Sequence, residues 1–427
     1  MTTTTPTTAP VHHTAAALPP RRWKTVIVLA VLSLVGFVFF GLLGEPGEVS
    51  FVWSDDGDAI RLNNTTVVSQ VFCLVAGGIA LLATAYAGWL AWSRKPVALW
   101  ISILVGFLFL AGLLAWVGAD GRVPVVFLLT GAIALSSAVV YGSLAGVIGE
   151  RVGVANIAIE GQLLAGAFVS AVVASVTDNL LLGVLAAMIG GALVSLVLAS
   201  FSIKYLVDQI VVGVVLNALV IGLTNFFYSA ALSENSQTLN FPGTLPFLPI
   251  PFLSSIPVIG PVFFDQRITT YLMFILVPLV WFVLFKTRIG LRIRAIGEHP
   301  LAADTVGLNV NRTRFWTVTI AGMIAGLGGA ALTLGSVGAF VREMSAGQGF
   351  IALAAVILGR WNPWLAALAA LLFGFSRNFR IWAGQAGSTI PPDLIAMTPY
   401  LVTLIAVAVL VGRAVGPAAV GKPYVKQ

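Results

Sequence analysis

The chain has 427 residues, of which 59% are hydrophobic and 9% are charged, whereas a soluble domain carries about 25% charged residues. This composition excludes a soluble globular protein and indicates a polytopic membrane protein. The net charge of +7 does not indicate a nucleic-acid partner, because the basic residues cluster in short loops on one side, as the positive-inside rule requires. The single cysteine, Cys73, excludes an internal disulfide, and three histidines offer no metal-ligand cluster.

Apolar runs recur along the chain and predict an all-α fold with about 10–12 transmembrane helices, some of them short or broken. Many runs reach the roughly 20 residues that cross a bilayer as a helix. Outer-membrane strands would instead be about 10 residues long and would alternate in polarity. The protein is therefore expected in the cell membrane as a multi-pass helical protein. The runs are 25–44, 66–92, 96–119, 123–149, 161–177, 179–203, 209–233, 268–285, 315–341, 344–359, 364–376 and 394–412.

The N-terminal part is predicted to be an addition to the rest of the chain. Residues 1–20 are rich in Thr, Pro and Ala, cannot bury a core, and are expected to form a disordered cytoplasmic tail. The first apolar run is too long for the hydrophobic region of a signal peptide. Loop 45–64 carries five acidic residues and one basic residue, which suits the outside. Residues 21–122 are therefore predicted to hold three transmembrane helices, of which the sequence reveals no role.

Residues 123–413 are predicted to form the main transmembrane core. Its passage 141–168 contains four glycines that argue against a continuous rigid helix, and unwound backbone at membrane depth is tolerated only where it is buried in protein or faces a watery cavity. Asn156 and Glu160, one helical turn apart, would then lie on the wall of a polar path. The alternatives for Glu160 are a loop residue at the cytoplasmic end, ten residues after Glu150, or a carboxylate that caps a broken helix. The four glycines are Gly142, Gly146, Gly149 and Gly153.

Two further features of the core are polar or irregular. Asn217 and Asn225 lie at membrane depth, where an asparagine lines a path or, alternatively, hydrogen-bonds between helices. Segment 234–267 contains six prolines, which exclude a regular long helix. It is expected to be an ordered external loop that can meet a soluble partner. The short run 344–359 is expected to be a tilted or half-buried helix, and the direction of all later spans depends on it.

Loop 290–310 lies between two long apolar runs and is itself polar, with basic residues on both sides, so it is expected in the cytoplasm. Pro300 opens a short helical segment, 301–306, and Gly307 stands where such a helix would end. The sequence therefore predicts a short exposed helix that is capped at both ends. The alternative is an ordinary basic loop whose charges only set the topology.

This loop resembles the EAA-type coupling loop of ABC importer permeases, in the version found in nucleoside and simple-sugar permeases, which are relatives of branched-chain amino-acid permeases. A second similarity is the Asn-Ile-x-x-Glu-Gly sequence, which stands here as Asn156, Ile157, Glu160 and Gly161, and a third is the Leu216-Asn217 pair. The resemblance extends from Val123 to about Arg413. The coupling residues that it implies are Arg294, Gly297, Glu298, Pro300, Ala302, Ala303 and Gly307.

The resemblance implies the permease subunit of an ATP-driven importer, most similar to nucleoside permeases. It implies a substrate path at Asn156, Glu160, Gly161 and Asn217, with Phe168, Phe226 and Phe227 as candidate stacking aromatics. It also implies four partners: a cytoplasmic ABC ATPase, a second permease subunit, an extracellular substrate-binding lipoprotein and a small-molecule substrate. Both termini, including tail 414–427, are expected in the cytoplasm.

No enzymatic or nucleotide-binding site is expected in the chain. The G-x-x-x-x-G-K string at 416–422 resembles a phosphate-binding loop, but Pro423 replaces the required Ser or Thr, so the match is due to chance. No cofactor is therefore expected in this chain, and ATP would be used by the partner subunit. The sequence shows no Ser-His-Asp, Cys-His or paired-carboxylate arrangement for catalysis.

Three alternatives stay open at this point. The first is a simple-sugar ABC permease. The second is an ion-coupled secondary transporter in which Glu160 is the coupling carboxylate. The third is a membrane scaffold, which the polar residues at membrane depth disfavour.

Overall fold

The computed structural model describes residues 23–54, 57, 60–386, 397 and 415–426. Tail 1–20 and the predicted last span, 394–412, therefore lie outside the described residues, apart from residue 397. The described residues include nine helices that are long and apolar enough to cross a membrane. This finding confirms the all-α, polytopic fold. The chain divides into two compact units, which are described separately.

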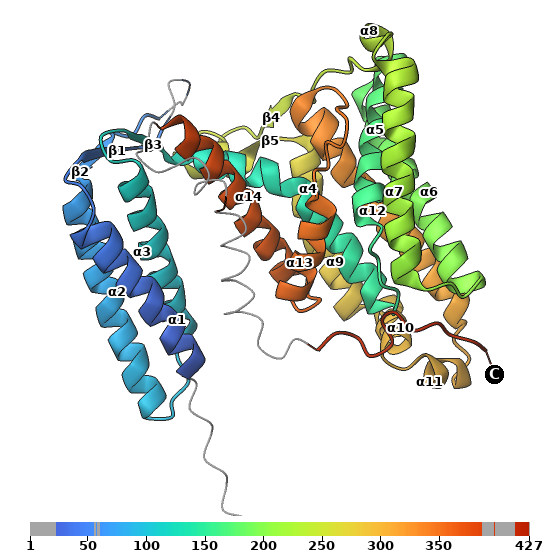
Figure 1. The fold of residues 1–427 in the computed structure, drawn as a ribbon, viewed down its shortest axis with the longest axis horizontal. Coiled ribbons are helices and arrows are strands. Elements are labelled where there is room, and N and C mark those ends of the chain that lie inside the picture. The colour runs from blue at the N-terminus through green and yellow to red at the C-terminus, as the bar shows by residue number, and fades with distance from the viewer. Residues whose placement is uncertain (1–22, 55–56, 58–59, 387–396, 398–414, 427) are drawn as a thin grey trace, which may run out of the picture. The chain divides into compact units, whose positions relative to one another are not determined.

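The first unit is a bundle of three helical segments (Figure 1). They are α1 (Trp23–Leu34) with its continuation η1 (Val35–Leu42), α2 (Ser69–Trp92) and α3 (Leu99–Val117). Polar contacts cross the bundle: Ser33 and Thr84 hydroxyls are 2.9 Å apart, and the Ser69 hydroxyl donates to the Ala115 carbonyl at 2.7 Å. Such hydroxyl contacts link helices where lipid offers no other partner.

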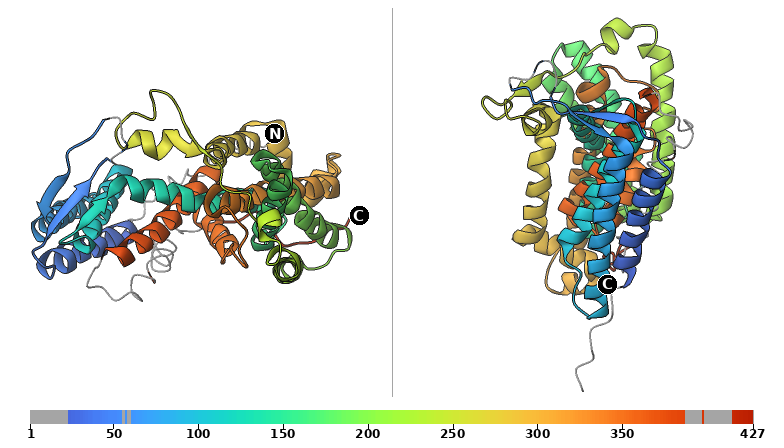
Figure 2. Two further views of the ribbon diagram at one scale, coloured as in Figure 1. Left: turned by 90° about the horizontal axis from the view of Figure 1, so that it is seen from above. Right: turned by 90° about the vertical axis from the view of Figure 1, so that its left-hand side faces the viewer.

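The second unit holds the remaining long helices, and α4 and α12 run through its middle (Figure 1). Figure 2 shows α5, α6 and α7, in green, grouped side by side. The helices are α4 (Val125–Arg151), α5 (Ile159–Thr177), α6 (Leu180–Ala199) with η2 (Ser200–Lys204), α7 (Gln209–Phe227) with η3 (Tyr228–Leu232), α9 (Ile268–Lys286), α12 (Val310–Leu332) with η5 (Thr333–Val337), α13 (Gln348–Leu358) and α14 (Pro363–Gln385).

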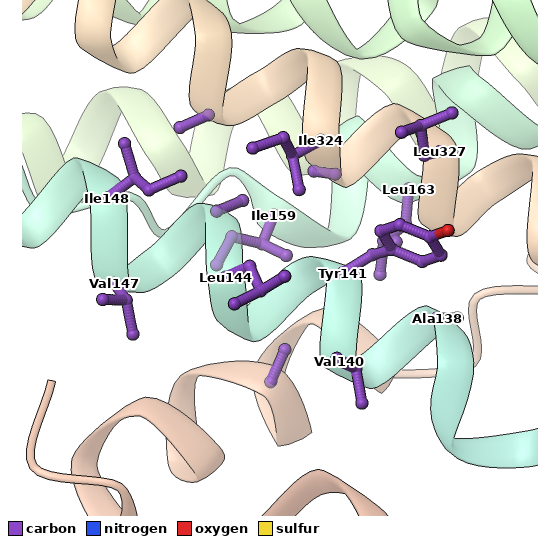
Figure 3. Packing of buried hydrophobic residues seen from close by; sticks show 14 of the residues in the cluster. Ala138, Val140, Tyr141, Leu144, Val147, Ile148, Ile159, Leu163, Ile324 and Leu327 are labelled. Carbon is purple, nitrogen blue, oxygen red and sulfur yellow. The ribbon is translucent and has the colours of Figure 1, made fainter. Parts of the chain in front are cut away.

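Small residues allow the backbone of α12 to lie in direct contact with the backbones of α5 and α6. A Cβ added to Gly166 of α5 would lie 2.5 Å from the carbonyl oxygen of Gly326, and one added to Gly191 of α6 would lie 2.2 Å from that of Gly322. Close backbone packing of this kind is how helices associate in lipid, where the hydrophobic effect gives no drive. Larger side chains fill the layer between α4, α5 and α12, including Leu144, Ile159, Leu163, Ile324 and Leu327 (Figure 3).

The helix break predicted in 141–168 is shorter than expected. Gly142, Gly146 and Gly149 lie inside the continuous helix α4, and only Gly153, with φ of +89°, lies in the break between α4 and α5. The prediction that the first three interrupt the helix is wrong. Their role is packing: added Cβ atoms at Gly142 and Gly146 would lie 2.9 Å from Ala352 and 2.8 Å from Val356 of α13. This packing offsets the roughly 1 kcal/mol that each glycine costs in a helix.

The bounds of helices α13 and α14 can also be compared with the predicted apolar runs 344–359 and 364–376. Helix α13 has 11 residues, too few to cross a bilayer, as predicted for 344–359. Helix α14 does not end at Ser376 but continues through Arg377 to Gln385. Contact with α4 explains the extension, because the Asn378 amide donates to the Phe127 and Leu128 carbonyls, both at 3.0 Å.

The proline-rich segment 234–267 contains no long helix, in agreement with the prediction. It forms the short helices α8 (Ser236–Leu239) and η4 (Gly260–Phe264), and the antiparallel strands β4 (Phe247–Pro249) and β5 (Asp265–Arg267). Elsewhere, β1 (Glu48–Val52) pairs in parallel with β3 (Arg122–Pro124), with Ser50 opposite Arg122. A further short strand is β2 (Thr65–Val68).

Candidate coupling site and substrate path

The polar loop between α9 and α12 folds as two helices, α10 (Arg288–Glu298) and α11 (Pro300–Thr305), which we call the coupling hairpin. The sequence analysis predicted only the second helix. The first one is capped by Thr287, whose hydroxyl accepts a hydrogen bond from the Gly290 amide at 3.2 Å. Helical spacing of the buried residues Ile293 and Ile296 was a signal that could have identified it.

The end of α10 lies directly against the end of α4. A Cβ added to Gly297 would lie 2.1 Å from the carbonyl oxygen of Arg151, so only glycine permits this approach. The neighbouring Glu298 carboxylate attracts the Arg151 guanidinium. Arg151 and Arg294 both lie over the Phe285 ring, at 5.3 and 5.1 Å from its centre. Three of the predicted coupling residues therefore form the junction between the hairpin and the transmembrane core.

Helix α11 is capped as the sequence predicts. Pro300 occupies its first turn, and the Ala302 amide points to Nδ1 of His299 at 3.4 Å. At its other end Gly307 has φ of +83°, and the Leu308 amide donates to the Ala303 carbonyl at 3.1 Å. A left-handed glycine after the last turn is a common helix stop.

The two faces of α11 differ in exposure. Ala303 is buried against the protein, while Leu301 is 44% exposed and Val306, just after the helix, is 75% exposed. Leu301 and Val306 are thus apolar side chains at the surface of an otherwise polar loop. The inner face of α11 is therefore packed against the protein, and its outer face is exposed.

Asn156, the first predicted path residue, is fully buried in the break between α4 and α5. Its amide exchanges two hydrogen bonds with the Gln162 amide, at 3.0 and 3.1 Å. Gln162 also donates to the Ser195 hydroxyl on α6 at 2.8 Å. The side chain therefore belongs to a closed network that joins the break to α5 and α6.

Glu160 is buried at the start of α5, and both of its carboxylate oxygens are engaged. Oε1 accepts from the Gly347 amide at 2.8 Å, and Oε2 accepts from the Gly349 amide at 2.6 Å. These amides belong to the N-terminus of α13, where a carboxylate satisfies otherwise free donors and opposes the positive end of the helix dipole. The geometry is that of the helix-capping alternative given for Glu160.

Asn217 of α7 performs a similar task for α5. Its Oδ1 accepts from the Gly161 amide at 2.8 Å and its Nδ2 donates to the Ile157 carbonyl at 2.9 Å. Gly161 provides the room, because a Cβ there would lie 3.1 Å from Asn217 Oδ1. The structure thus brings all four predicted path residues together around the start of α5, as buried connections between helices.

The three candidate aromatics also lie together. Phe168 is 6.2 Å from Phe227, and Phe227 is 5.4 Å from Phe226, between ring centres. Phe340, which the sequence analysis missed, packs edge-on against Phe168 at 5.2 Å. Beside them the Asn225 amide donates to the Glu343 carboxylate at 3.1 Å.

A polar cavity of about 610 Å³ lies between the first half of α4, the β4–β5 pair and the start of α9. Sequence reasoning missed it, because its residues come from distant segments. Arg267 lies over the Phe247 ring at 4.7 Å and donates to the Gly335 carbonyl at 3.0 Å. Burial lowers the pKa of Arg267, although an arginine stays charged at neutral pH. The other polar lining residues include Thr130, Ser137, Asp265, Thr269, Thr270 and Ser336.

Among the residues that the structure describes, no group of three or more His, Cys, Asp or Glu side chains could hold a metal ion.

A model of the branched-chain amino acid transport system permease component matches residues 125–414. The guanosine ABC transporter permease protein NupQ of Bacillus subtilis is 41% identical over 66% of this chain and 92% of its own length. The nucleoside ABC transporter permease protein NupC of Lactococcus lactis is 38% identical over 68% of this chain and 94% of its own. The glucose ABC transporter permease protein TsgB13 of Haloferax volcanii is 27% identical over 72% and 78%. No solved structure shows significant similarity to the chain.

Proposed function

Because the chain belongs to the branched-chain amino acid transport system permease family, a family of transport proteins and not of enzymes, we propose that it is the nucleoside-carrying subunit of an ATP-driven importer. The substrate assignment is supported by two relatives that are named as guanosine and nucleoside permeases and that align with this chain over more than nine tenths of their length. A simple sugar is the second candidate, because glucose permeases also resemble the chain.

The coupling hairpin is the observation that carries this proposal. It is polar, capped at both ends and anchored through Gly297, and it leaves Leu301 and Val306 exposed. A cytoplasmic ABC ATPase would receive these side chains in a groove, which is recognition of a helix by an apolar groove. ATP would then be bound and hydrolysed by that partner, with no cofactor in this chain.

Two further partners complete the proposed importer. In Bacillus subtilis two guanosine permease proteins, NupQ and NupP, resemble this chain at 41% and 26% identity. In Lactococcus lactis two nucleoside permease proteins, NupC and NupB, resemble it at 38% and 32% identity, NupB over 30% of this chain. These pairs support a second, different permease subunit beside this one. An extracellular lipoprotein would deliver the substrate to the loop region 234–267.

The proposed topology follows from charge. Residues 286–314 hold six basic and two acidic residues, whereas 45–64 hold five acidic and one basic. The positive-inside rule then puts the coupling hairpin and both termini in the cytoplasm. Segments 45–64 and 234–267, with the polar cavity beside β4 and β5, would face the outside.

Transport would proceed by alternating access. Closure of the ATPase dimer on ATP would move the coupling hairpin, and the junction at Gly297 and Arg151 would transmit this motion to α4. The break between α4 and α5 with Asn156, Glu160, Gly161 and Asn217 would change arrangement as the path opens to the other side. A neutral nucleoside requires polar partners but no opposing charge, and the hydroxyl-rich outer cavity offers such partners at its entry.

The decisive experiment measures uptake of labelled guanosine by cells that express the chain with its partner subunits. ATP is depleted in one sample while the proton gradient is preserved, and the gradient is collapsed in another while ATP is preserved. Loss of uptake only in the first sample is expected. Loss only in the second would establish the ion-coupled alternative. ATP-dependent uptake of labelled glucose, with no uptake of labelled guanosine, would assign the chain to sugars.

A further inference from the structure

The C-terminal residues 415–426, which we call the C-terminal strap, lie against the coupling hairpin. The Ala419 amide donates to the Gly297 carbonyl at 2.9 Å, and the Ala418 amide donates to the Glu298 carboxylate at 3.3 Å. Figure 1 shows the dark red terminal segment passing α10. The strap is therefore fixed to the last residues of α10.

The same strap contacts α11 and α12. The side chain of Tyr424, a residue only 5% exposed, lies beside the carboxylate of Asp304 on α11. Burial and this carboxylate both raise the pKa of Tyr424. On α12, the buried Arg314 donates through Nη1 to the Lys422 carbonyl at 3.1 Å. Three consecutive helices thus share one binding segment.

The beginning of the strap lies at the turn between α13 and α14. A Cβ added to Gly416 would lie 2.8 Å from the ring of Trp361, so the strap backbone passes over this indole. Trp361 in turn accepts a hydrogen bond from Arg151 at 3.1 Å through its carbonyl, and its ring nitrogen donates to the Glu150 carboxylate. The strap therefore also reaches the end of α4.

Two glycines of the apparent phosphate-binding string have local explanations. Gly416 leaves room for Trp361, and Gly421 has φ of +76°, a conformation that L side chains rarely adopt. The intervening Ala418 and Ala419 bring their amides close to α10. The glycines of the string 416–422 therefore allow the strap to lie against the coupling hairpin, and the string is not a nucleotide site.

We propose that the C-terminal strap is a positioning element that makes α10 and α11 move as one body with α4 and α12. The hairpin needs such an element because only His299 separates its two helices, and an unsupported one-residue link can act as a hinge. The strap contacts α10 at Gly297 and Glu298 and contacts α11 at Asp304, so it bridges that hinge. This inference rests on the proposed coupling of the hairpin to an ATPase.

Without the strap, the ATPase would still bind at Leu301 and Val306. Part of the motion of the ATPase would then bend the hairpin at His299 instead of moving α4. The expected result is ATP hydrolysis with less substrate transported per ATP. A merely structural role would lower both activities in parallel, because the amount of folded protein would fall. The ratio of transport to hydrolysis therefore distinguishes positioning from stability.

The test uses the full importer, purified with its ATPase and second permease and reconstituted in vesicles that allow uptake and hydrolysis to be measured together. Two variants are compared with the parent: deletion of residues 415–427, and Tyr424→Phe, which removes one hydroxyl. The control is Val425→Ala, because Val425 is 61% exposed. For Tyr424→Phe we expect transport per ATP to fall about fivefold, the size of one net hydrogen bond, with ATPase association retained.

If both variants keep the same ratio of transport to ATP hydrolysis as the parent protein, the role proposed for the strap is overturned. Parallel loss of uptake and hydrolysis in Tyr424→Phe would also overturn it, in favour of a purely structural contact. Failure of the proposed function looks different, because the parent protein itself would then take up substrate without ATP. We expect the Val425→Ala control to keep the parental ratio, and a drop equal to that of Tyr424→Phe would also overturn the role proposed for the strap.

Discussion

Glu160 and Gly349 are joined by a hydrogen bond and by close backbone packing. The Gly349 amide donates to Glu160 Oε2 at 2.6 Å, and a Cβ on Gly349 would lie 2.4 Å from the backbone nitrogen of Glu160. The carboxylate thus fixes where the short helix α13 begins, and glycine is required for α13 to come so close. The start of α5 and the start of α13 therefore form one structural unit in the middle of the transmembrane core.

This relationship predicts that Glu160→Gln lowers stability as well as transport. An amide has one acceptor oxygen, so one of the two glycine amides would lose its partner, at a cost of about 1–3 kcal/mol. We expect a lower melting temperature in detergent and reduced uptake, with ATPase association retained. Asn156→Ala should reduce uptake in the same way. An ion-coupled carrier would behave differently, because Glu160→Gln would remove the pH dependence of uptake and the parental uptake would be indifferent to ATP depletion.

Gly297→Ala should abolish uptake while the protein stays in the membrane. The added methyl group would lie 2.1 Å from the Arg151 carbonyl, so the end of α10 must move away from α4. The matched control is Gly222→Ala in α7, where a Cβ meets nothing within 4 Å. Uptake assays and membrane protein levels report the result. Parental uptake in Gly297→Ala would show that the α10–α4 junction transmits no motion.

Val306→Asp is expected to weaken ATPase association by about tenfold or more, since burying a charge in an apolar groove without a partner costs several kcal/mol. Val306 is 75% exposed, so the folded chain itself should tolerate the change. Phe252→Asp is the control, because Phe252 is 91% exposed and belongs to the separate segment 234–267. Co-purification of the ATPase is measured for both. Equal yields would place the ATPase contact elsewhere.

We expect a substitution in the polar cavity beside β4 and β5 to reduce uptake at low substrate concentration. Asp265→Asn keeps the size of the side chain but removes its charge and one acceptor. We expect the concentration for half-maximal uptake to rise about fivefold, as for loss of one hydrogen bond, with maximal uptake near that of the parent. A lower maximum at an unchanged half-saturation would indicate that Asp265 acts after substrate entry.

Cysteine labelling tests the topology. In a Cys73→Ala background, an impermeant reagent should label position 252 from outside intact cells and should not label position 299. Permeabilised cells should give labelling at both positions. Labelling of position 299 in intact cells would reverse the proposed orientation of the coupling hairpin.

The sequence by itself determined the class of the molecule and the two ends of helix α11. Uncharged runs that are long enough to cross a bilayer predict a helical membrane protein, because a helix satisfies all its backbone hydrogen bonds within the span. Pro300 and Gly307 mark the ends of α11 because proline fits a first helical turn and glycine fits a left-handed stop. These are local properties, which a sequence encodes within a few residues.

Tertiary structure decided the rest. The glycines of α4 look like helix breakers in the sequence, yet Gly142 and Gly146 are helical because α13 packs against them. Glu160 looks like an isolated acid until Gly347 and Gly349 approach from 187 and 189 residues away. The strap looks like a chance phosphate-loop string until Ala419 meets Gly297. Each of these outcomes depends on backbone groups of distant residues, and hydrogen bonds from a main chain leave no signature in the identity of the residue that donates them.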